Sequence, residues 1–163
     1  MRRIVAALLL VIRAGQAPAQ VDVTSHQTIF PGPYDAEVVQ VIDGDTLEVI
    51  VALWPGLRAE YRVRVRGIDA PELYRPACRE EAELAEVARQ QAERLYPPGT
   101  AVQLRDVSYD AFAGRVVADI RRWRTDRWLP LGKELMDRGL AVEWDPRQSA
   151  FVWCPTGTEP VSE

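Results

Sequence analysis

Three carboxylate side chains follow strand-like segments and are suited to form one polar cluster. Asp45 begins an alternating segment after the turn signal Asp43-Gly44, and Asp69 and Glu72 lie in a turn after another alternating segment. Carboxylates from separate elements, without nearby soft ligands, suit a hard divalent cation such as calcium or magnesium. We therefore expect Asp45 and Asp69 to bind one cation, and Glu72 to hold a water molecule beside it.

Two arginines complete a set of residues suited to phosphodiester hydrolysis. Arg64 lies on the arginine face of the alternating segment 61–67, and Arg115 follows Gly114. Guanidinium groups bind phosphoryl oxygens in bidentate fashion and stabilise a charge-rich transition state. A bound cation would lower the barrier to attack by water, and a carboxylate would orient or deprotonate that water. These residue types predict a metal-dependent phosphodiesterase.

Each of these residues also has a purely structural interpretation. The turn before Asp45 is common in hairpins, and arginines that alternate with valines usually mark the solvated face of a strand. Asp69 and Glu72 could instead cap the following helix, and Gly114-Arg115 could form a bulge with a surface charge. The catalytic interpretation therefore depends on the combination of these residues.

The segments between these residues predict a small barrel with helices. Patterns of period two predict strands over 36–42, 45–52, 61–67, 101–107 and 115–120, and patterns of period 3.6 predict helices over 79–95 and near 129–138. Five short, mostly antiparallel strands leave no open edge when they close into a barrel. We expect a five-stranded OB-fold barrel, with one long helix after the third strand and a shorter carboxyl-terminal helix.

Four segments of the chain resemble motifs of the staphylococcal nuclease (thermonuclease) family, in the same order. They are VIDGDTLEV at 41–49, RVRGIDAPEL at 64–73, DAFAGRVVADI at 110–120 and LMDRGLAVEW at 135–144. The resemblance runs from about residue 36 to 144. It implies an OB-fold barrel and calcium-dependent cleavage of DNA and RNA with little sequence preference.

The resemblance also implies a role for each carboxylate of the cluster. Asp45 and Asp69 match the calcium-binding carboxylates, and Ala70 matches a position that contributes its backbone carbonyl. Glu72 matches the residue usually assigned as the general base, although its role as base or as water-orienting group is debated. The implied cofactor is one Ca²⁺ ion.

Arg64 and Arg115 match the two phosphate-binding arginines of the family, and Arg115 also matches a group that assists the leaving group. The loop 110–114 is one residue longer than in the type protein, and it lacks the lysine and tyrosine expected there to grip a terminal phosphate. Trp144 lies near a position where an aromatic residue flanks the bound base. It could stack on a base, and packing in the core is the alternative.

The amino terminus has the three parts of a secretory signal peptide. Residues 1–3 are basic at two positions, residues 4–12 are apolar, and Ala17-Pro18-Ala19 is a cleavage pattern. A short amphipathic helix is the alternative. We expect residues 1–19 to be removed on export, residues 20–35 to form an extended lead-in, and the mature protein to be secreted or periplasmic. No apolar run of 18 residues predicts a membrane anchor.

Export would leave an acidic protein. The formal net charge of the whole chain is −4, and the expected signal peptide contains three arginines and no acid, so the mature chain would have a charge of −7. Such a protein has no general attraction for a polyphosphate. Binding of nucleic acid would therefore depend on a local cluster of arginines and a bound cation.

The two cysteines, Cys78 and Cys154, both follow the expected cleavage site. In an oxidising compartment an even number favours one disulfide, whereas two unrelated buried thiols are the cytosolic alternative. Two cysteines and one histidine make a poor zinc site. The bridge would tie the tail 146–163 to the nuclease-like domain 36–145.

These observations predict an exported nuclease that acts as a monomer on DNA or RNA. One alternative is a catalytically silent OB module that binds a polymer or a partner protein. A role within an exopolysaccharide or plasmid gene cluster is another. The presence of Glu72 beside both arginines favours the enzyme, because a binding module does not need a water-activating carboxylate.

Overall fold

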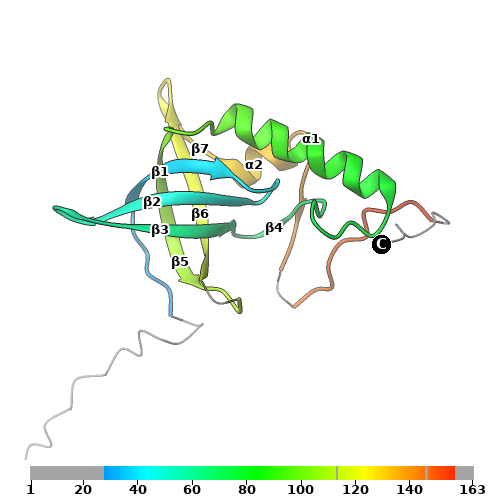
Figure 1. Cartoon of the computed structure of the whole chain (residues 1–163), viewed down its shortest axis with the longest axis horizontal. Helices are drawn as coiled ribbons and strands as arrows, with labels where there is room; N and C mark the ends of the chain where they lie inside the picture. The colour runs from blue at the N-terminus through cyan, green and yellow to red at the C-terminus, as the bar shows by residue number, and fades with distance from the viewer. Residues whose placement is uncertain (1–27, 113, 146, 157–163) are drawn as a thin grey trace, which may run out of the picture.

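The computed structural model describes residues 28–112, 114–145 and 147–156, and a closed β-barrel forms its centre (Figure 1). The barrel strands are β1 (Tyr34–Val41), β2 (Thr46–Trp54), β3 (Leu57–Val65), β5 (Ala101–Tyr109) and β6 (Arg115–Arg124). Antiparallel pairing gives the order β3-β2-β1-β5-β6, and a parallel pairing of β3 with β6 closes the ring. The predicted five-stranded barrel with helices is therefore confirmed. The expected signal peptide lies outside the described residues.

Two helices and three short strands complete the described fold. They are α1 (Arg79–Leu95), α2 (Leu131–Met136), β4 (Ile68–Asp69), β7 (Arg127–Pro130) and β8 (Val142–Glu143). Strand β4 pairs with β8, and β7 extends the sheet beyond β6. The long helix begins and ends at the predicted residues. None of the described helices is long and apolar enough to cross a membrane.

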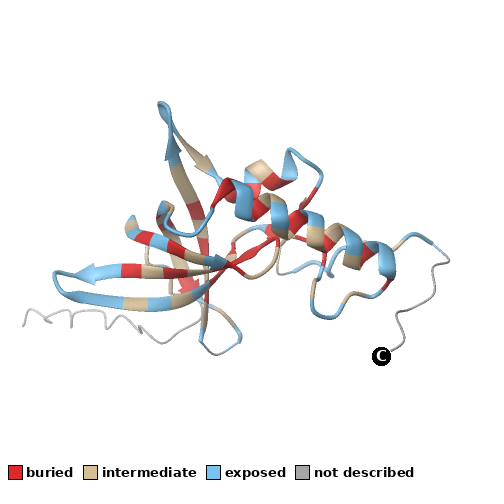
Figure 2. Cartoon of the chain, turned by 45° about the horizontal axis from the view of Figure 1, so that its top comes forward, coloured by how far each residue is buried: buried red, intermediate tan, exposed pale blue. Residues whose placement is uncertain are grey.

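The core lies inside the barrel and beneath α1 (Figure 2). Alternate residues of the strands point inward, so that Leu47, Val49 and Val63 are completely buried. The face of α1 against the barrel consists mainly of small residues, including the fully buried Ala88. Small side chains let the helix backbone approach the β1–β2 turn closely. A Cβ atom at Gly44 of this turn would lie 3.0 Å from the Cβ of Ala88.

The strands are longer than their patterns predicted. The predicted loop 53–57 is a tight hairpin, in which β2 runs to Trp54 and β3 starts at Leu57. Strand β7 occupies part of the segment predicted as a second helix near 129–138, so α2 begins only after Pro130. These strand ends extend past the core, where both faces are exposed and the alternation of apolar and polar residues is lost.

Candidate active site

The candidate site is built where β2, β3 and β4 meet at one end of the barrel. Pairing of β2 with β3 places Thr46 opposite Arg64, and the N–H of Val65 donates to the carbonyl of Asp45 at 2.8 Å. Asp69 ends β4, two residues after the turn that follows β3. Two predicted cation ligands and one predicted phosphate ligand are thereby brought together.

Arg64 bridges the two aspartates. Its Nη1 atom lies 2.9 Å from Oδ1 of Asp45, and its Nη2 atom lies 3.2 Å from Oδ1 of Asp69. The Asp45 carboxylate also accepts hydrogen bonds from the Thr46 hydroxyl at 3.0 Å and from the Ala70 N–H at 3.2 Å. Two carboxylates and one guanidinium group leave a formal charge of −1 in this cluster.

The pKa of Asp45 reflects mainly its burial. Only 3% of the residue is exposed. Burial, with a smaller contribution from the nearby Asp43, raises the pKa of Asp45 to about 7 despite the lowering effect of Arg64. A buried carboxylate that is incompletely neutralised is suited to bind a cation, and protons then compete with that cation.

The donor set fits a hard cation but is small. Asp45, Asp69 and the Ala70 carbonyl would offer oxygen atoms, and the remaining ligands of a calcium ion would be water or substrate oxygens. Among the residues that the structure describes, the one group of three ligand-type side chains within 4.8 Å is Cys78, Glu81 and Cys154. Both sulfurs of that group belong to a disulfide, so it is not a metal site.

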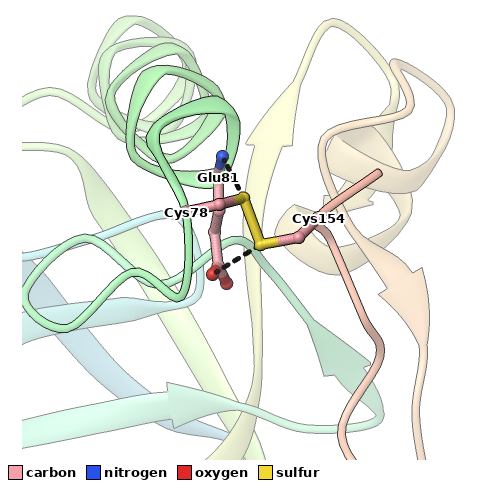
Figure 3. A group of neighbouring side chains, drawn as sticks. All are labelled: Cys78, Glu81 and Cys154. Atoms are coloured by element: carbon pink, nitrogen blue, oxygen red, sulfur yellow. Dashed lines mark hydrogen bonds between the residues drawn. A yellow bond between two sulfur atoms is a disulfide. The ribbon is translucent and has the colours of Figure 1, made fainter. Parts of the chain in front are cut away.

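Cys78 and Cys154 form the predicted disulfide, which lies beside Glu81 (Figure 3). Cys78 is the N-cap of α1, and its Sγ accepts a hydrogen bond from the N–H of Glu81 at 3.4 Å. The carboxylate of Glu81 lies 3.9 Å from Sγ of Cys154. The bridge therefore joins the start of α1 to the carboxyl-terminal tail.

Glu81 holds the turn that contains Glu72. It is only 7% exposed and accepts hydrogen bonds from the N–H groups of Glu72 at 3.2 Å and of Ala77 at 2.6 Å. The Glu72 side chain is exposed, and its carboxylate accepts from the Tyr74 N–H at 3.1 Å. Glu81 was not singled out from the sequence, although its position three residues after the N-cap Cys78 was an available signal.

The tail forms one wall of the carboxylate cluster. The N–H of Phe151 donates to Oδ2 of Asp69 at 3.2 Å. Phe151 and Trp153, packed edge to face with ring centroids 4.7 Å apart, line a cavity of about 130 Å³ together with Asp45 and Asp69. The sequence predicted a tethered tail, but not its position over the candidate cation ligands.

Arg115 lines a larger cleft, which Arg64 also lines. The parallel pairing of β3 and β6 places Arg115 opposite Arg62. A cleft of about 670 Å³ is lined by thirteen residues, including Arg64, Glu72 and Arg115. Three predicted catalytic side chains therefore line one cleft, next to the cluster that contains the predicted cation ligands.

Asp110 positions Arg115 within this cleft. Its Oδ2 atom lies 2.7 Å from Nε of Arg115. Although burial favours the neutral acid, the hydrogen bonds from Arg115 and from the Phe112 N–H lower the pKa of Asp110. Gly114 precedes Arg115 with a φ angle of 80°, a conformation that a residue with a Cβ adopts with strain. Asp110 was not singled out from the sequence.

The aromatic residues at the cleft differ from the one predicted. Trp144 is half-buried, with its ring centroid 5.8 Å from Cζ of Arg64, and it does not line the cleft. Tyr74 and Phe112 line it instead, with 70% and 68% of their surfaces exposed. The Phe112 ring also lies 4.9 Å from Cζ of Arg115. Exposed aromatic rings beside arginines suit the stacking of bases.

Comparison with known proteins adds no assignment. No protein-family model matches the chain, and no curated protein is significantly similar to it. The function is therefore inferred from the residues and geometry of the site.

Proposed function

We propose that the chain is an exported, metal-dependent nuclease of the staphylococcal nuclease type, which hydrolyses phosphodiester bonds of DNA or RNA. The observation that supports this function best is the placement of Arg64, Glu72 and Arg115 around one cleft, beside the pair Asp45 and Asp69. Two guanidinium groups and an exposed carboxylate, next to a pair of possible cation ligands, are suited to metal-dependent phosphodiester hydrolysis.

Each residue then has a defined task. Arg64 and Arg115 bind the phosphoryl oxygens and stabilise the charge that develops in the transition state. Glu72, whose carboxylate is exposed and whose backbone is held by Glu81, orients the attacking water and accepts its proton. A calcium ion held by the aspartates and the Ala70 carbonyl would supply a Lewis acid for the phosphate.

The aromatic residues favour a nucleic acid over other phosphodiesters. Tyr74 and Phe112 expose their rings within the same cleft as the arginines. A base on either side of the bound phosphate could stack on these rings, whereas a phosphodiester without bases gains nothing from them. Stacking is also tolerant of base identity, which agrees with little sequence preference.

The proposal is tested by incubating the purified protein with plasmid DNA and with total RNA, in calcium and then in chelator. We expect metal-dependent degradation, which Glu72→Gln and Arg115→Lys each lower by about 100-fold or more because they remove groups acting in the transition state. Glu83→Gln is the matched control, since Glu83 is an exposed glutamate of α1 that pairs with Arg79. Equal activity in the Glu72→Gln and parent proteins would contradict the mechanism.

The alternative is a catalytically silent OB module. It is favoured by one observation, namely that Arg64 already occupies an oxygen of both Asp45 and Asp69. In that case the cluster is a structural ion pair, and the cleft binds a polymer without cleaving it. Calorimetric titration with calcium separates the two functions, because the silent module would bind no calcium and would cleave nothing.

A further inference from the structure

The hairpin of β6 and β7 contains a cluster of arginines and tryptophans that the proposed catalytic cleft does not use. Residues 121–128 read RRWRTDRW, with four arginines, two tryptophans and a single acid, in a chain whose formal net charge is −4. The hairpin projects beyond the barrel, at the opposite end of β6 from Arg115 (Figure 1). Its tip is exposed (Figure 2).

Two of the four arginines have partners within the fold. Arg121 donates to Oε1 of Gln103 at 3.0 Å, and Arg122 forms an ion pair with Glu134 at 2.9 Å. Arg124 and Arg127, which lie opposite one another at the tip, are exposed and form no ion pair with the described residues. Their positive charges are therefore available to an anionic ligand.

The two tryptophans form a supported aromatic surface one position further from the tip, on the face of the hairpin opposite to Arg124 and Arg127, because successive residues of a strand point to opposite faces. Trp123 packs edge to face on Trp128, with ring centroids 5.3 Å apart, yet 56% of Trp123 remains exposed. The guanidinium group of Arg121 stacks on Trp128, with Cζ 4.6 Å from its centroid. The Trp123 ring is thus packed against a neighbour and still largely accessible, as a stacking platform requires.

We propose that the β6–β7 hairpin is a second binding site, in which a base of single-stranded nucleic acid stacks on Trp123 and the strand passes over the hairpin tip, where its phosphates contact the exposed side chains of Arg124 and Arg127. Single strands fit better than duplexes, because the bases of a duplex are already stacked on one another. The choice of ligand rests on the proposed nuclease function, whereas the binding chemistry rests on the hairpin itself.

Trp123 of the hairpin and Arg115 of the cleft lie along one face of β6. Residues 116, 118 and 120 are buried, so Arg115 and Trp123 share the outward face of the strand. A separation of eight strand residues corresponds to about 26 Å, at about 3.3 Å per residue. An OB fold contacts about 4–16 nucleotides, so one strand could reach both sites. The hairpin should then hold long substrates and leave short ones unaffected.

The test measures binding of a fluorescein-labelled single-stranded 20-nucleotide DNA by anisotropy, with chelator present so that nothing is cleaved. Arg124→Gln/Arg127→Gln should weaken binding about tenfold and reduce the slope of log K against log salt by about 1.4. Trp123→Ala should weaken binding about tenfold, and Trp123→Phe, which keeps a stacking ring, less than threefold. The matched control is Arg58→Gln/Arg94→Gln, which removes two exposed arginines elsewhere and should change binding less than twofold.

Three results would overturn the proposal. The first is that the control pair weakens binding as much as the arginine pair does. The second is that Trp123→Ala keeps the affinity of the parent protein, and the parent protein binds duplex DNA or heparin as tightly as the single strand. The third is that the parent protein does not bind the 20-nucleotide strand. If binding depends on the hairpin but no cleavage is observed, the result would support this binding site and contradict only the proposed nuclease function. If the protein cleaves, the double arginine variant should raise KM for the 20-nucleotide strand and not for a tetranucleotide.

Discussion

The disulfide between Cys78 and Cys154 should determine a large part of the stability of the fold. The two cysteines are 76 residues apart. In the chain-entropy treatment, closing a loop of this length removes about 15 cal/mol/K from the unfolded chain, which corresponds to about 4.5 kcal/mol at 25 °C. Replacing both cysteines by serine should therefore lower the free energy of unfolding by about 4 kcal/mol, as measured by urea unfolding followed by tryptophan fluorescence.

The same change should weaken calcium binding. The bridge holds the tail whose Phe151 N–H donates to Asp69, and this hydrogen bond fixes the orientation of a proposed cation ligand. We expect the calcium dissociation constant, measured by calorimetry, to rise about tenfold in the double serine variant. Phe151→Pro removes the donor while keeping the bridge, and should have a similar effect. Val152→Pro is its control, because Val152 is 75% exposed.

Two results would refute this reasoning, each at a different step. A loss of less than about 1 kcal/mol in the double serine variant would show that the closed loop does not restrict the unfolded chain as calculated. A normal loss of stability with unchanged calcium affinity, in both the double serine variant and Phe151→Pro, would show that the tail does not support Asp69.

Three further predictions concern the turn, the cation and the cleft. Gly44→Ala should lower the free energy of unfolding by about 1–3 kcal/mol in thermal or urea unfolding, because its Cβ would lie 3.0 Å from two packed alanine side chains. Calcium affinity should fall as the pH drops below about 7, approaching tenfold per pH unit, because the metal-free Asp45 then holds a proton that the cation must displace; a pH-independent dissociation constant between pH 5.5 and 8 would contradict this. Alanine at Tyr74 or Phe112 should raise KM for single-stranded DNA several-fold with little change in kcat, whereas an equal effect on kcat would argue against stacking.

The barrel and the main helix could be predicted because their signals are local. Val63 and Val65 alternate with arginines along β3, so period two alone showed which side chains point inward. Helix α1 is bounded by Cys78 at its N-cap and by Pro97-Pro98 shortly after its end, and its predicted limits agree with the structure. Closure of the barrel could be predicted because short strands with unpaired edges are unfavourable.

The β6–β7 hairpin could not be predicted in the same way. Its residues lie beyond the core, where arginines occupy both faces and no apolar alternation remains. Trp123 and Trp128 face one another only because the chain reverses at Thr125-Asp126. The helix predicted near 129–138 was consequently too long at its start.

The sequence by itself determined which residues could do chemistry, because Asp45, Arg64, Asp69, Glu72 and Arg115 are recognisable from their types and from the turns around them. Only the tertiary structure decided how these residues are connected. The hydrogen bond from Phe151 to Asp69 joins residues 82 positions apart, and the sharing of Arg64 between two aspartates depends on the pairing of β2 with β3. Contacts of this kind arise from the closure of the barrel and from the disulfide, and no local period in the sequence encodes them.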